Sequence, residues 1–172
     1  MMRLLFMAAL VALSTSTCMH TAASQSALEC RIEPRVPLEA GGPAEIRFVL
    51  TNPSREPVWF LRWNTPFDGW MGTIFTVTGP GGTELPYTGP MMKRGDPSRD
   101  EYVEIPPGGE VDAVVDLANV YDLREPGRHR LQVTGGIADL TTDGAGVPRP
   151  REQHQGAELR CGEVTLDVSP QG

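Results

Sequence analysis

Closely spaced turn signals constrain the fold of this chain more than any other feature of its sequence. Clusters of Gly, Pro and Asn recur at intervals of about eight to twelve residues, a spacing typical of short strands joined by tight turns. The clearest clusters are Gly41-Gly42-Pro43, Asn52-Pro53, Gly79-Pro80-Gly81-Gly82, Pro106-Pro107-Gly108-Gly109 and Pro126-Gly127. With 19 Gly and 16 Pro, the chain favours a turn-rich β fold over a helix bundle.

The segments between these turns alternate between apolar and polar residues, as strands with one buried face do. In residues 44–52, for example, Ile46, Phe48 and Leu50 share one face. The sequence predicts strands over residues 28–36, 44–52, 58–63, 73–78, 101–105, 110–117, 128–134 and 158–168. We therefore expect an all-β protein, an immunoglobulin-like β-sandwich of about seven to nine short antiparallel strands. One domain over residues 28–170 accounts for the whole pattern.

The N-terminus has the features of an export signal. A positive charge at Arg3 is followed by an apolar run over residues 4–13, which is too short to span a membrane. Thr21-Ala22-Ala23 offers small residues for cleavage, so residues 1–23 are predicted to be a signal peptide. In the alternative, the signal ends before Cys18, which is lipidated, although residues 15–17 fit a lipoprotein signal poorly. Either route predicts a periplasmic or extracellular protein, with membrane contact only through a lipid at Cys18.

Two cysteines, Cys30 and Cys161, remain in the predicted domain. Because an exported protein meets an oxidising compartment, we expect a disulfide between the first strand and the last. Closing a loop of about 130 residues is worth roughly 4–5 kcal/mol in the chain-entropy model. Two buried free thiols are the alternative.

Charge and motif content argue against several functions. The net charge is −7, and no Lys/Arg-rich tract provides a surface for nucleic acid. The sequence contains no His-Glu-x-x-His, no Gly-x-Ser-x-Gly, no phosphate-binding loop and no Cys-x-x-Cys. His20 falls in the predicted signal, and we expect His129 and His154 at the surface rather than as metal ligands. No catalytic residue, metal or cofactor is predicted.

Residues 30–135 contain several short motifs in a fixed order: Thr65-Pro66-x-Asp68-Gly69, Pro86-Tyr87-Thr88-Gly89, Lys93-Arg94-Gly95-Asp96-Pro97, Pro107-Gly108-Gly109-Glu110, Val115-Asp116-Leu117, and Tyr121-Asp122-Leu123 with Pro126-Gly127. Together they resemble the non-catalytic N-terminal β-domain of bacterial peptidyl-Lys metalloendopeptidases, which belong to the deuterolysin-like (aspzincin) group. Most of these residues suit turns, and Tyr121 occupies a place like that of a tyrosine corner.

In the family that the chain resembles, this domain precedes a zinc protease domain with His-Glu-x-x-His and a downstream Asp ligand. Neither motif occurs here, so no catalytic or zinc residue carries over. The resemblance implies a secreted, non-catalytic β-domain that binds a protein or peptide, with an exported protease as the favoured partner. A carbohydrate-binding module is the alternative, and an active peptidase is the least favoured.

Residues 64–72 and 88–100 are predicted to form the contact surface. We expect Trp59 and Trp63, which share a strand face, to fill the sandwich core. Phe67 and Trp70 flank a loop and are expected to be exposed, where they would supply stacking rings for a sugar. The candidate binding residues are Phe67, Asp68, Trp70, Lys93, Arg94 and Asp96.

Overall fold

Two sheets packed face to face form the body of the protein, which we describe from a computed structural model that covers residues 28–35 and 37–172. The predicted signal peptide, residues 1–23, and the alternative lipidation site Cys18 lie outside the described residues. The first sheet is antiparallel and has the order β1-β3-β7. Its strands are β1 (Glu29–Pro34), β3 (Glu45–Thr51) and β7 (Glu110–Asp116).

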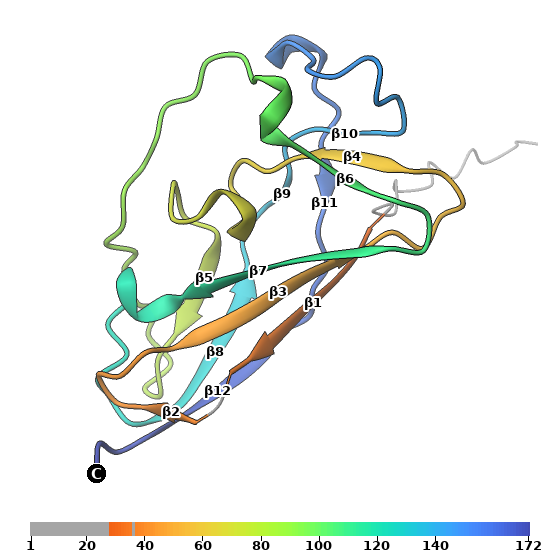
Figure 1. The fold of residues 1–172 in the computed structure, drawn as a ribbon. Coiled ribbons are helices and arrows are strands. Elements are labelled where there is room, and N and C mark those ends of the chain that lie inside the picture. Colours follow the sequence, from red (N-terminus) through yellow and green to blue (C-terminus); the bar gives the residue numbers. More distant parts are fainter. Residues whose placement is uncertain (1–27, 36) are drawn as a thin grey trace, which may run out of the picture.

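The second sheet has the order β2-β12-β8-β5 (Figure 1). Its strands are β2 (Leu38–Glu39), β5 (Phe75–Thr78), β8 (Gly127–Val133) and β12 (Val164–Ser169). When the long strands of the two sheets are lettered as in an immunoglobulin domain, β1, β3 and β7 are A, B and E, and β5, β8 and β12 are C, F and G. The sheets are then A-B-E and C-F-G, which is the immunoglobulin arrangement. The predicted sandwich is confirmed.

One strand pair departs from the antiparallel prediction. β2 runs parallel to β12, with Leu38 opposite Val168, at a place where the sequence predicts only a turn. β1 has already paired with β3 in the first sheet. β2 belongs to the second sheet and forms no hairpin with β1. Its direction is therefore set by its pairing with β12, which a local turn signal does not predict.

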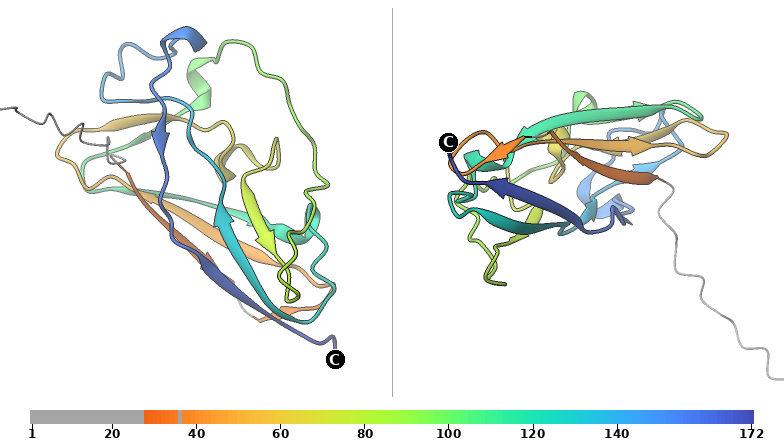
Figure 2. Two further views of the ribbon diagram at one scale, coloured as in Figure 1. Left: turned by 180° about the vertical axis from the view of Figure 1, so that it is seen from behind. Right: turned by 90° about the horizontal axis from the view of Figure 1, so that it is seen from below.

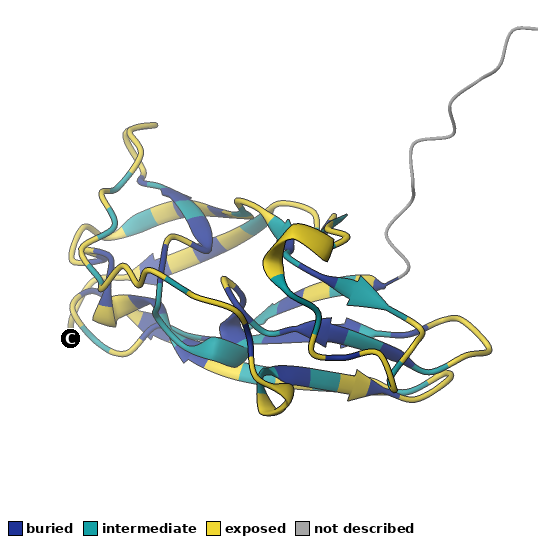
Figure 3. Ribbon diagram, turned by 90° about the horizontal axis from the view of Figure 1, so that it is seen from above, coloured by how far each residue is buried: buried dark blue, intermediate teal, exposed yellow. Residues whose placement is uncertain are grey.

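The core lies between the two sheets, which are visible as separate layers in Figure 2. Ile46, Phe48 and Leu50 of β3 are fully buried, as the alternation predicts. They face buried side chains of the second sheet that include Phe75 and Leu131. Figure 3 shows how buried and exposed residues alternate along the strands, whereas exposed residues dominate the loops. Each fully buried side chain of this size is worth about 1.5–3 kcal/mol of transfer free energy.

The expected surface position of His129 is wrong. Arg128, Arg130 and Gln132 are the exposed residues of β8, so the alternation turns His129 and Leu131 inward. The His129 side chain is fully buried, and its Nδ1 lies 3.3 Å from the carbonyl oxygen of Gly127. Its Nε2 has no hydrogen-bond partner.

A third, smaller sheet with the order β10-β4-β6 lies at one end of the sandwich, in the upper part of Figure 1. Its strands are β4 (Val58–Leu61), β6 (Tyr102–Ile105) and β10 (Leu140–Thr141), and the short pair β9 (Gly136–Ile137) and β11 (Ala157–Glu158) lies nearby. We call residues 58–65, 98–105 and 137–157 the cap. Its own small core is formed by Leu61, Trp63, Tyr102 and Val147.

The strand count agrees with the prediction when short pairs are set aside. The described residues contain eight strands of four or more residues and four strands of two residues. Only the two-residue strands were not predicted from the sequence, because they are too short to show an alternation of apolar and polar residues. The described residues also contain four 3-10 turns, η1 (Pro66–Asp68), η2 (Arg99–Glu101), η3 (Leu117–Asn119) and η4 (Arg151–Gln153).

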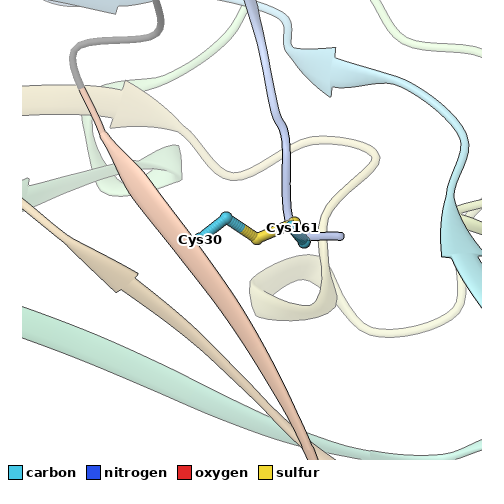
Figure 4. Close-up of a disulfide and its surroundings, with 2 residues drawn as sticks. All are labelled: Cys30 and Cys161. Carbon is cyan, nitrogen blue, oxygen red and sulfur yellow. A yellow bond between two sulfur atoms is a disulfide. The ribbon is translucent and has the colours of Figure 1, made fainter. Parts of the chain in front are cut away.

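The predicted disulfide is confirmed. It joins Cys30 of β1 to Cys161, with 4.6 Å between the Cα atoms and 131 positions between the residues in sequence (Figure 4). Cys161 lies in the segment between β11 and β12, not within the last strand as expected. The bridge therefore fixes the first strand to the segment that leads into the last one.

Tyr121, in the connection between β7 and β8, makes a buried hydrogen bond to the second sheet. Its hydroxyl donates to the carbonyl oxygen of Phe75 on β5 at 2.5 Å. A tyrosine corner normally bonds the backbone a few residues upstream, whereas this tyrosine reaches a strand far away in sequence. Burial, with a smaller contribution from Tyr87, raises the pKa of Tyr121 to about 12.

Candidate binding surface at one end of the sandwich

Three long connections meet at the cap end of the sandwich. They join β3 to β5, β5 to β7 and β8 to β12, and they contribute β4, β6 and the β9–β11 region respectively. Loops held by a rigid sandwich commonly carry function. The two predicted contact loops, residues 64–72 and 88–100, both belong to this assembly.

Residues 88–97, which we call the strap, run along the outside of the molecule toward η2 (Figure 1). At its lower end, the backbone N–H and the hydroxyl of Thr88 both donate to the carbonyl oxygen of Val120, at 2.9 and 3.0 Å. In the middle, the N–H of Met92 donates to the carbonyl oxygen of Met71 at 3.0 Å. The Thr88 bonds fix the strap to the connection between β7 and β8, and the Met92 bond fixes it to the predicted contact loop over residues 64–72.

Arg94 attaches the upper part of the strap through its charge. Its guanidinium pairs with the carboxylate of Asp68, lies 3.5 Å from a carboxylate oxygen of Glu101 and lies 5.3 Å from the ring centre of Trp63. Only 6% of the Asp68 side chain and 21% of the Arg94 side chain are exposed. Burial raises the pKa of Asp68 despite the nearby charges of Arg94 and Arg62. Two predicted site residues, Asp68 and Arg94, are thus paired with each other.

Glu101 links this cluster to the cap. It accepts hydrogen bonds from the indole N–H of Trp63 at 2.7 Å and from the backbone N–H of Ser98 at 2.9 Å. Burial alone would raise the pKa of Glu101, but the bonds from Ser98 and Trp63 and the charge of Arg94 outweigh it and lower the pKa. Glu101 and Ser98 also form the capping box that begins η2.

Asp139 is the buried centre of the cap. Its carboxylate accepts hydrogen bonds from the Tyr102 hydroxyl at 2.7 Å, from Arg149 Nε at 2.9 Å and from the N–H of Gln155 at 2.7 Å. Burial would raise the pKa of Asp139, but the hydrogen bonds of Arg149, Gln155 and Tyr102 lower it. Burial and the bond to Asp139 raise the pKa of Tyr102 to about 12. No short sequence motif predicts this network, because Tyr102 comes from the β5–β7 connection and the other members are spread over residues 139–155 of the β8–β12 connection.

Arginine side chains connect the strap to the loop over residues 142–153. Arg151 donates to the carbonyl oxygen of Arg94 at 2.8 Å, and its N–H donates to Asp96 at 3.2 Å. Arg99, just beyond the strap, donates to the carbonyl oxygen of Val147 at 2.8 Å. The strap therefore has neighbours on both sides, which limits its freedom to move.

Phe67 and Trp70 are not exposed as expected. Both are half-buried and pack against the main core. Phe67 contacts the edge of Phe60 with ring centres 5.2 Å apart, and Trp70 contacts Tyr121 at 6.3 Å. The reason lies in η1, which Gly69 closes at a φ of 68°, so that this loop folds back onto the sandwich.

Trp59 and Trp63 share a face, as predicted, but this face covers the cap core and not the sandwich core. Phe60, on the opposite face of β4, is the residue that enters the sandwich core. Both faces of β4 are covered because the cap lies on its outer side. Trp63 is buried, whereas Trp59 is half-buried beneath Gly144.

The exposed part of the predicted site is small. Lys93 and Asp96 are exposed, whereas Asp68 and Arg94 bind each other. Sequence reasoning missed Met91 and Met92, whose exposed fractions are 79% and 53%. Two adjacent methionines in an otherwise polar, turn-rich segment were the available signal, because such a segment offers no buried face for them.

Two further observations concern metals and membranes. Within residues 28–35 and 37–172, no three His, Cys, Asp or Glu side chains gather closely enough to hold a metal ion. In the same part of the chain, no helix has the length and apolar character that crossing a membrane requires.

Comparison with known proteins gives similarities to fungal proteases. The chain is 24% identical over 121 residues to the probable neutral protease 2 homolog B of Trichophyton rubrum, covering 69% of this chain and 33% of that protein. It is 27% identical over 135 residues to a neutral protease 2 homolog of Arthroderma gypseum, covering 77% of this chain and 34% of that protein. The chain thus spans about a third of the length of these relatives. The similarities support a metallopeptidase-related β-domain.

Comparisons with family models and solved structures do not narrow the relationship further. No family model matches the chain. The X-ray structure of the structural genomics target SoR45 covers 82% of this chain and 84% of its own, with 14% identity and a TM-score of 0.40. A similarity at that level does not refine the fold.

Proposed function

We propose that this protein is an exported, non-catalytic binding domain whose partner is an exported protease. The motifs over residues 65–127 resemble the N-terminal β-domain of bacterial peptidyl-Lys metalloendopeptidases, and the fungal similarities support a relationship to metallopeptidases in general. The non-catalytic role is a prediction from the sequence, which contains no His-Glu-x-x-His. Proteolytic activity of the chain itself remains the least favoured alternative.

The observation that carries the proposal is the exposed Met91–Met92 pair on a fixed strap. Apolar side chains this exposed contribute nothing to the core and are typical of sites that bind another protein. The hydrogen bonds of Thr88 and Met92 and the ion pair of Arg94 order the strap before binding. Such preorganisation lowers the entropy that association costs.

Export of the protein is supported by the Cys30–Cys161 disulfide, which is compatible with an oxidising compartment. We place the protein in the periplasm or outside the cell, after removal of the signal peptide over residues 1–23. A lipid on Cys18 is the alternative. Mass spectrometry of the mature N-terminus distinguishes the two routes.

A pull-down tests the proposed partner. Tagged protein is incubated with the culture supernatant of the producing organism, and retained proteins are identified by mass spectrometry. We expect an identified protease to be retained by the wild type and lost with Met91→Asp/Met92→Asp. Val114→Asp, at an exposed position of β7, is the matched control.

The carbohydrate-binding alternative depends on Phe67 and Trp70, and their half-burial against other rings leaves neither as a flat, open platform. A glycan array with wild type and Trp70→Ala tests it directly. Retention by glycans alone, sensitive to Trp70→Ala, would replace the protease proposal.

A further inference from the structure

We infer that the strap enters the substrate cleft of its protease partner, so that the protein acts as an inhibitor and not merely as a passive binding module. This inference rests on the proposed function and specifies which part of the protease is bound. Its basis is the shape of the strap, the pattern of its anchors and the residues that it leaves exposed.

The shape of the strap suits a cleft. Residues 91–95 contain no helix, turn or bend, and they follow the outside of the molecule (Figure 1). Endopeptidases bind their substrates as extended segments, and extended segments are recognised through backbone hydrogen bonds together with pockets for side chains. An extended segment on the outside of the molecule can enter a groove but offers no groove of its own.

The anchors of the strap leave its outer side free. Thr88, Met92 and Arg94 bind Val120, Met71 and Asp68 respectively, using two backbone groups, one hydroxyl and one guanidinium. Beyond them, Arg151 binds the carbonyl oxygen of Arg94. Segments held on both sides of the contact point lose little entropy on binding. A flexible substrate lacks this advantage.

The exposed residues of the strap indicate the chemistry of the protease cleft that would bind it. Met91 and Met92 are large, unbranched apolar side chains that adapt to irregular pockets, and Lys93 adds a positive charge. The partner is therefore an endopeptidase with an apolar pocket beside an acidic group. The exposed Arg99 and Arg151 beside the strap add to the positive charge of Lys93, although the net charge of the whole chain is −7.

Inhibition of peptide hydrolysis tests the inference, because a short fluorogenic peptide reports only on the substrate cleft. The probe is the protease that the wild type retains from the culture supernatant, and binding of the full exported chain to it is measured separately by calorimetry. We expect competitive inhibition, in which KM rises and kcat is unchanged. Met91→Asp should raise the inhibition constant about tenfold or more, whereas Val114→Asp should leave it unchanged.

A second variant tests the role of the anchors. Thr88→Val removes the hydroxyl bond to Val120 without changing Met91, Met92 or Lys93. We expect it to weaken inhibition several-fold while thermal unfolding shows an intact fold. Inhibition by Thr88→Val equal to that by the wild type would overturn the claim that the strap is preorganised.

The outcomes separate the two proposals. Binding without inhibition of peptide hydrolysis, or inhibition that is equal for Met91→Asp and the wild type, overturns the cleft inference but leaves a protease partner intact. Retention of no protease from the culture supernatant, or absence of binding to the retained protease by calorimetry, overturns the cleft inference and the proposed function together.

Discussion

Asn52 is the residue on which two turns depend. Its side chain is completely buried and donates to the carbonyl oxygens of Glu56 at 2.8 Å and Ile105 at 3.0 Å, while its Oδ1 accepts from Ser54. Its backbone N–H donates to the carbonyl oxygen of Gly109 at 2.9 Å. One side chain thus fastens the turn after β3 to the turn between β6 and β7.

Replacement of Asn52 by an apolar residue of similar size should lower the stability of the folded protein. Asn52→Leu leaves several buried carbonyl groups without donors, so we expect the free energy of unfolding to fall by about 3 kcal/mol. Urea denaturation measures the change. Ser54→Ala, which removes one hydroxyl from the same turn, is the control, with an expected loss of about 1 kcal/mol. Equal losses of unfolding free energy for the two variants would contradict the role of Asn52 in holding the two turns together.

Replacement of His129 by an apolar residue, unlike that of Asn52, should not destabilise the protein. Its Nε2 is buried without a partner, and an unsatisfied polar atom costs free energy that an apolar side chain does not. His129→Leu should leave the stability unchanged or raise it by about 1 kcal/mol, as measured by the midpoint of thermal unfolding. A loss of about 2 kcal/mol or more would mean that the ring makes a compensating interaction in solution.

At the scale of elements, the long strands, including β4 and β6, were predictable, but their assembly with the later loop into a cap was not. Residues of β3 and β7 alternate clearly, and the turns around them contain Gly and Pro, so local signals sufficed. The cap depends on contacts such as that of Asp139 with Arg149, and the strap on that of Arg94 with Asp68. No short-range pattern encodes these pairs. The wrong expectation for Phe67 has the same cause, because the return of its loop onto the core is a tertiary feature.

The cap should open when its buried carboxylate is lost. Asp139→Asn leaves the Arg149 guanidinium buried without its counter-charge, so we expect local destabilisation of about 3 kcal/mol. Hydrogen exchange should become faster over residues 139–156 and stay unchanged in β3. Asp167→Asn, at an exposed ion pair of β12, is the control and should alter neither region.

Acid should weaken the same element. Because the pKa of Asp139 is lowered in the folded protein, its stabilisation is present above the unfolded value of about 4 and is lost as the pH falls through the lower folded value. The exchange rate over the cap should therefore rise at acid pH in the wild type. This pH dependence should be reduced in Asp139→Asn, and an unchanged dependence would contradict the assignment.

For the whole molecule, alkaline pH tests both cores at once. The pKa values of Tyr102 in the cap and Tyr121 in the sandwich are each raised to about 12, from an unfolded value of about 10. A raised pKa stabilises the folded state below the unfolded value, and this contribution is lost as the pH rises through the folded one. We expect urea midpoints to fall from about pH 10 upward, because each tyrosine then loses stabilisation at a limiting rate of about 1.4 kcal/mol per pH unit.

Single tyrosine variants separate the two contributions. Tyr121→Phe should reduce the alkaline slope of the main transition, whereas Tyr102→Phe should reduce it in the exchange of the cap alone. If both variants keep the slope of the wild type, then other groups control stability at high pH.

The Cys30–Cys161 bridge turns most of the polypeptide into a covalent ring, and the strap lies on that ring. A single cut in the strap would open the ring without producing two separate molecules. The nicked protein would run as one band on a gel until the disulfide is reduced, and as two afterwards. A protease that cleaves the strap at Met91 or Met92 would thus leave both new chain ends on one disulfide-linked molecule, which can stay bound in the cleft.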